Sequence, residues 1–134
     1  MRPISYKAVV SGETEEIIER VTRALKTEGF GILTRIDLHT KIKEKLGMDL
    51  SPTVILGACN PQLAYDAYAL NTDVATLLPC NVAIREVSPG KQSIELARPS
   101  AMMELLGDEK LVRMTEAADR KLLSVLTQLE GKAA

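Results

Sequence analysis

Two Cys-Asn dipeptides have the residue types and the spacing that could support chemistry in this sequence. Cys59-Asn60 follows one apolar segment, and Cys80-Asn81 begins another. If these segments are neighbouring antiparallel strands, which lie about 4.8 Å apart, the Cα atoms of the two cysteines should lie within about 10 Å at one edge of the sheet. If the segment between them is a parallel crossover, the pairs lie at opposite edges. Both cysteines could instead be buried packing residues, because free cysteine is among the most buried residue types.

The first pair lies where a strand is expected to lead into a helix. At such a position, backbone N–H groups and the helix dipole favour a thiolate or a bound anion. The leading hypothesis is therefore a small-ligand or anion site formed by Cys59, Asn60, Cys80 and Asn81. The alternatives are a thiol-dependent protein for redox, sulfur-transfer or metal-handling chemistry, and an interaction scaffold without a small ligand. Whether the protein is an enzyme stays open.

His39 is the only histidine of the chain, and Asp37 lies two residues before it. Both are included in the candidate ligand site, and with Cys59 they could form a thiol-imidazole-carboxylate set. Two thiols and one imidazole are fewer than the four ligands of a structural zinc site, so neither such a site nor a cofactor is expected. A two-thiol site for a soft monovalent metal is the remaining metal alternative.

The elements that would position these residues follow from the hydrophobic periodicity. Alternation predicts strands over 4–10, 30–38, 80–87 and 91–98, and the continuous apolar run 53–59 predicts a central strand covered on both faces. Helices are predicted between Gly12 and Gly29, over 40–46, from Asn60-Pro61 to about residue 71, and over 111–129. The chain is thus expected to be a single α+β domain over 1–134, of order βαββ(α)ββα, in which strands adjacent in sequence pair.

Composition narrows the possible partners. Seventeen basic and eighteen acidic residues give a net charge of −1, and only 3% of residues are aromatic, which argues against nucleic acid. Neither a signal peptide nor a membrane helix is expected, so the cytoplasm is the predicted location. The long apolar stripe of the C-terminal helix could leave area for a second subunit, which predicts a homodimer.

Several motifs together resemble a known family: the segments 29–34, 36–37 and 43–47, Leu56-Gly57-Ala58-Cys59-Asn60-Pro61, and Leu78-Pro79-Cys80-Asn81-Val82. The chain is identified as a member of the prokaryotic family numbered 302 among the domains of unknown function. The resemblance implies a curved antiparallel sheet with helices on one face, similar to the TATA-binding protein, and a homodimer. It also implies that the turn residues Gly57, Asn60, Pro61, Leu78 and Pro79 define the fold, whereas the cysteines are a feature of a subgroup.

Overall fold

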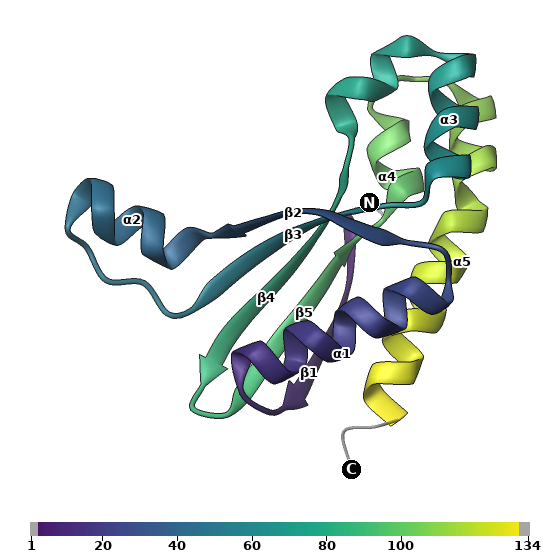
Figure 1. Ribbon diagram of the computed structural model, residues 1–134. Helices are drawn as coiled ribbons and strands as arrows, with labels where there is room; N and C mark the ends of the chain where they lie inside the picture. The colour runs from purple at the N-terminus through teal and green to yellow at the C-terminus, as the bar shows by residue number, and fades with distance from the viewer. Residues whose placement is uncertain (1–2, 132–134) are drawn as a thin grey trace.

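A computed structural model describes residues 3–131 and contains one five-stranded antiparallel sheet with the strand order β1-β5-β4-β3-β2 (Figure 1). The strands are β1 (Ser5–Ser11), β2 (Gly31–Asp37), β3 (Thr53–Cys59), β4 (Cys80–Ser88) and β5 (Lys91–Ala97). The helices are α1 (Thr14–Thr27), α2 (Leu38–Leu46), α3 (Pro61–Leu70), the 3₁₀ helix η1 (Thr72–Leu77), α4 (Pro99–Glu104) and α5 (Glu109–Gly131). The predicted α+β class and all five strands are confirmed.

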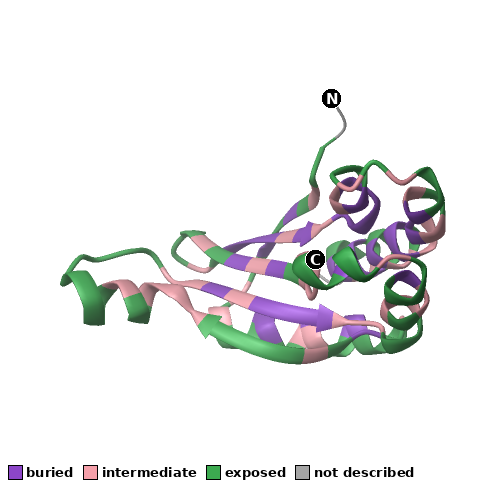
Figure 2. Cartoon of the chain, turned by 90° about the horizontal axis from the view of Figure 1, so that it is seen from above, coloured by how far each residue is buried: buried purple, intermediate pink, exposed green. Residues whose placement is uncertain are grey.

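One face of the sheet carries the core. In β1, Ala8 and Val10 are buried while Lys7 and Val9 are exposed, because successive side chains point to opposite faces. The same alternation buries Val82 and Ile84 in β4. Helices α1 and α5 pack against the buried face, and buried and exposed residues alternate along several strands (Figure 2). The expectation that β3 is covered on both faces is therefore wrong, since Ile55 on its open face is only half-buried.

The C-terminal helix packs within the molecule. Leu122, Val125 and Leu129 of α5 are buried in the same cluster as Val21 and Leu25 of α1. Their helical spacing produces the apolar stripe seen in the sequence. Because this stripe is covered by the chain's own core, it leaves no surface for a second subunit, and this reason for expecting a dimer does not hold.

The connections differ from expectation in two respects. Strands β2 to β5 form the predicted meander, but β1 pairs with β5, so β1 and β2 lie at opposite edges of the sheet. Helix α4 and η1 were not predicted, because each has only six residues and too few turns to establish a period. Both lie beyond one end of the sheet, close to α3 and α5 (Figure 1).

Helix α2 and the loop after it extend away from the sheet beyond β2 and β3 (Figure 1). No residue of Leu38–Leu46 is buried, although the helix ends at Gly47 in a left-handed conformation as predicted. We call residues 38–50 the α2 arm. Within residues 3–131, no helix is both long enough and apolar enough to cross a bilayer.

Candidate functional site

The two Cys-Asn pairs meet at one edge of the sheet. Strands β3 and β4 are antiparallel neighbours, and their register pairs Ala58 with Cys80 and Gly57 with Asn81. Paired Cα atoms lie about 4.5–5.5 Å apart. Cys59 is one residue, or about 3.8 Å, from Ala58. The Cα atoms of Cys59 and Cys80 are therefore at most about 9 Å apart, which confirms the predicted arrangement.

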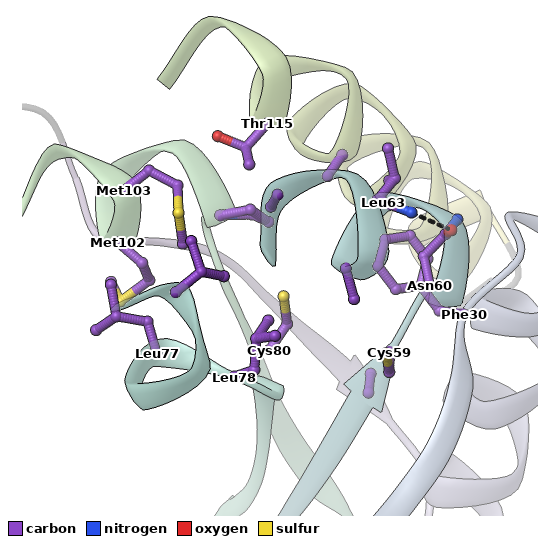
Figure 3. A pocket seen from close by; sticks show the side chains of 16 residues that line it. Phe30, Cys59, Asn60, Leu63, Leu77, Leu78, Cys80, Met102, Met103 and Thr115 are labelled. Atoms are coloured by element: carbon purple, nitrogen blue, oxygen red, sulfur yellow. Dashed lines mark hydrogen bonds between the residues drawn. The ribbon is translucent and has the colours of Figure 1, made fainter. Parts of the chain in front are cut away.

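Both cysteines line a partly enclosed cavity of about 40 Å³ at this end of the sheet (Figure 3). Side chains along a strand alternate between faces, but Cys59 is the last residue of β3, where the chain turns into α3. Helix α3 and η1 enclose the cavity on one side, and α4 and α5 on another. Of the sixteen lining residues, none is charged, and most are aliphatic.

Asn60 holds the start of the helix that covers the cavity. Its side-chain oxygen accepts a hydrogen bond from the Leu63 N–H at 3.2 Å, and its Nδ2 donates to the Glu28 carbonyl at 3.4 Å. Pro61 occupies the first helical position. The predicted cap is confirmed, and it accounts for both polar ends of the Asn60 amide.

The anion alternative finds little support at this helix start. Pro61 has no N–H, and the Leu63 N–H already donates to Asn60. No Lys, Arg or His is among the residues that line the cavity. An anion would therefore lose its hydration without gaining a compensating charge.

The environment of both thiols raises their pKa values. Burial raises the pKa of Cys80 to about 11, and Cys59 and Asp119 act in the same direction. Burial also raises the pKa of Cys59, although this residue precedes a helix N-terminus. Both cysteines are free. Because the thiolate is the nucleophile, thiol catalysis near neutral pH is disfavoured at either position.

Asp37 and His39 lie at the other end of the sheet. The register pairs Gly31 with Cys59 but Asp37 with Val54, five residues earlier on β3. At about 3.4 Å per residue, this separation is about 17 Å. The thiol-imidazole-carboxylate set is therefore ruled out, because β2 is too long to bring both of its ends to one site.

These two residues have local partners instead. Arg35 donates from Nε to Asp37 at 2.8 Å and binds both carboxylate oxygens of Glu15, at 2.5 and 3.1 Å. Hydrogen bonds from Arg35 hold the pKa of Asp37 and of Glu15 below their usual values. His39 accepts the Thr53 N–H at Nδ1 at 3.0 Å and lines an open hollow of about 310 Å³ below the α2 arm.

Asn81 also lies outside the cavity, and several residues that line the cavity were not predicted. Asn81 is exposed, and it is not among the cavity-lining residues, because it lies on the open face opposite Gly57. Met102 and Met103 of α4 do line the cavity, as does Thr115 of α5, whose hydroxyl donates to the Leu111 carbonyl at 2.8 Å. The available signal in the sequence was the pair of adjacent methionines before the last helix.

Comparison with known proteins identifies the family. The profile described as "Domain of unknown function DUF302" matches residues 6–129, which is nearly the whole chain. The chain belongs to the DUF302 family. A crystal structure of the uncharacterized conserved protein DUF302 from Bacillus stearothermophilus superposes with a TM-score of 0.88 at 31% sequence identity. The match covers 96% of this chain and 99% of that one. No curated protein matches.

Two of the residues that the resemblance marked as fold-defining for DUF302 have a direct structural explanation. Gly57 lies in the middle of β3, and a Cβ atom at this position would be 2.7 Å from Cγ of Pro79 and would also collide with the Thr34 hydroxyl. Pro79 follows a cis peptide bond from Leu78 and immediately precedes β4. Gly57 therefore allows the Leu-Pro segment to pack directly on the open face of the sheet, opposite the covering helices.

Proposed function

We propose that this DUF302 protein is a binding module that takes a very small ligand into the cavity between β3, β4 and the covering helices. The observation that carries this proposal is that none of the sixteen lining residues is charged, although the cavity lies at the end of the sheet. Ligand sites are typically apolar with a few placed polar groups. Here those groups are the thiols of Cys59 and Cys80, with the Thr115 hydroxyl.

The size of the cavity limits the ligand. A cavity of about 150 Å³ admits benzene, whereas a single water needs about 10–15 Å³. At about 40 Å³, this cavity holds a species of a few atoms in its present form. An aromatic ring would require α3 or α4 to move.

The raised pKa values of both thiols favour binding over thiol-dependent catalysis. A nucleophilic cysteine is normally found in an electropositive, partly exposed environment that lowers its pKa. Cys80 lies in the opposite kind of environment, with Asp119 near enough to raise its pKa further. The thiols therefore serve as soft contacts for the ligand rather than as nucleophiles.

Xenon tests the proposal, because it is apolar, monatomic and known to enter dry protein cavities. We expect xenon to shift amide NMR signals of residues that line the cavity, such as Ala67 and Thr115. The variant Ala64→Leu fills the cavity and should abolish these shifts. Ala69→Leu adds the same atoms to an exposed position of α3 and should preserve them. Equal xenon responses in the two variants would refute the cavity as the binding site.

We also propose that the protein is a homodimer, with the α2 arm as the contact with the second copy. An isolated helix of nine residues is marginal in water, and α2 buries none of them. Leu46, Met48 and Leu50 of the arm are 64%, 62% and 44% exposed, and Ile36 at its base is 46% exposed.

Sedimentation tests the dimer. At micromolar concentration we expect a species of twice 14.6 kDa. Leu46→Asp with Met48→Asp should shift it to the monomer, whereas Leu123→Asp, at another exposed apolar position, should not. A native chain that sediments only as the monomer would refute the proposal.

A further inference from the structure

The cavity concentrates sulfur atoms. The sequence contains two cysteines and five methionines, and four of these seven side chains line this one cavity: Cys59, Cys80, Met102 and Met103. They come from β3, β4 and α4, so the fold brings them together from three separate segments. In Figure 3 the Cys80 thiol points toward the space enclosed by the helices, and the Met103 side chain extends into it from α4.

Thiolate and thioether groups are soft ligands, which select monovalent copper and similar ions. Ligands for harder ions are lacking here, because no carboxylate or imidazole lines the cavity. Among residues 3–131, no group of three or more His, Cys, Asp and Glu side chains could hold a metal ion. A site for zinc, calcium or magnesium is thus disfavoured by the same residues that favour a soft ion.

We propose that the cavity binds one soft monovalent metal ion of the copper(I) or silver(I) class, with the sulfur atoms of Cys59 and Cys80 as the main ligands and Met103 as an additional ligand. This inference rests on the proposed function, because it names the ligand of the same cavity. A single ion also suits a volume of about 40 Å³, which is too small for an aromatic ring.

The backbone geometry is compatible with a bridging ion. A metal–thiolate bond is about 2.3 Å, so two sulfur atoms that share an ion lie at most about 4.6 Å apart. The register keeps the Cα atoms of Cys59 and Cys80 within about 9 Å, and both residues line the same cavity. The cysteines are free rather than joined by a disulfide, so both thiols are available as ligands.

The charge balance is also defined. Binding of one monovalent ion by both cysteines releases two protons, because each thiol is deprotonated when it becomes a ligand. Two thiolates and one positive ion leave a complex with a single negative charge.

Anaerobic titration of the whole chain with copper(I), in competition with the chelator bicinchoninate, tests the inference. We expect one ion per chain and an X-ray absorption spectrum with sulfur ligands only. Cys59→Ser or Cys80→Ser should weaken copper(I) binding by at least about 100-fold, because each removes a direct ligand, whereas loss of a residue that only supports a ligand typically costs about 10–100-fold. Met103→Leu should weaken binding by about tenfold. Met114→Leu is the matched control, because Met114 packs in the same hydrophobic cluster as Met103 but does not line the cavity. This variant should bind copper(I) as tightly as the unaltered protein.

A measurement on the unaltered protein avoids dependence on the folding of the variants. One equivalent of silver(I) should protect both cysteines from alkylation, whereas sodium ions should protect neither. The inference would be overturned by nitrogen or oxygen ligands in the spectrum, or by thiols that silver(I) leaves unprotected. It would also be overturned if the Cys59→Ser/Cys80→Ser variant bound copper(I) as tightly as the unaltered protein. Xenon separates the two proposals: if it binds while copper(I) does not, the cavity remains a ligand site and only the metal is wrong. If neither binds, both proposals fail.

Discussion

Gly57 and Pro79 are in direct contact on the open face of the sheet, since a Cβ atom on Gly57 would lie 2.7 Å from Cγ of Pro79. The two residues belong to neighbouring segments of the sheet, Gly57 to the middle of β3 and Pro79 to the residue before β4. Real Cβ atoms do not approach other atoms so closely. The position can therefore carry no side chain while the Leu78-Pro79 segment keeps its place.

Gly57→Ala should destabilise the protein. The added methyl group forces Pro79 or Thr34 to move, and overpacking of this kind typically costs about 1–3 kcal/mol. Urea unfolding measures the change. Gly31→Ala is the control, because Gly31 is also in a strand but has no atom within 4 Å of the place that the added methyl group would take. Equal losses in the two variants would contradict the packing explanation.

Asn60→Ala should lower the free energy of unfolding by about 1 kcal/mol, the usual contribution of an N-cap. The variant loses the hydrogen bond to the Leu63 N–H and the link to the Glu28 carbonyl. Asn81→Ala makes the same change at an exposed position, where the side chain has no hydrogen bond within residues 3–131, and should cost little. If Asn81→Ala lowered the free energy of unfolding as much as Asn60→Ala does, the N-cap would contribute nothing to stability.

Alkylation of Cys80 in the native protein should be slow at neutral pH. A pKa raised to about 11 keeps the thiol protonated, so the rate should increase about tenfold per pH unit and level off only near pH 11. In urea the same thiol should level off near the ordinary cysteine pKa of about 8.5. Mass spectrometry of the labelled peptide follows both rates. If the native rate levelled off at a lower pH than the rate of the unfolded chain, the thiol would be activated by the fold.

The Arg35 cluster should make stability sensitive to acid. The pKa values of Glu15 and Asp37 are lowered in the folded state, so their contribution is complete above the ordinary values of 4.5 and 3.8 and is lost as pH falls through the lower folded values. Arg35→Met should cost about 0.2–1 kcal/mol at pH 7, since the pairs are exposed. The difference from the native protein should shrink below about pH 4 in urea titrations at several pH values. A difference that stays constant down to about pH 2 would exclude the ion pairs as its cause.

The meeting of Cys59 and Cys80 was predictable, because it requires only that two strands adjacent in sequence pair. The remote position of Asp37 also follows from strand length once β2 is known to begin at Gly31. The contribution of Met103 was not predictable. It depends on where α4 packs, and a six-residue helix carries too little periodicity to show which side faces the cavity.

The faces of β2 show a second limit of sequence reasoning. The register shifts between Ile32 and Thr34, which reverses the alternation along the rest of the strand. Simple alternation from Ile32 would put Thr34 on the same face of the sheet as Ile32, and Arg35 on the opposite face. The observed register places Arg35 beside Leu56 on the buried face, where it reaches Glu15 of α1. An irregularity of one residue cannot be detected in a seven-residue strand without a partner register.

The pairing of β1 with β5 has a consequence for synthesis on the ribosome. Ser11 and Lys91 are partners, yet 80 positions separate them, so the first strand is made long before its neighbour. At about 5–20 residues per second, the delay is about 4–16 s. During that time β1 has no strand to pair with, whereas β2 to β5 can pair successively as they emerge. The N-terminal strand should therefore be the last to join the sheet, and the nascent chain is most exposed to aggregation or chaperone binding through this segment.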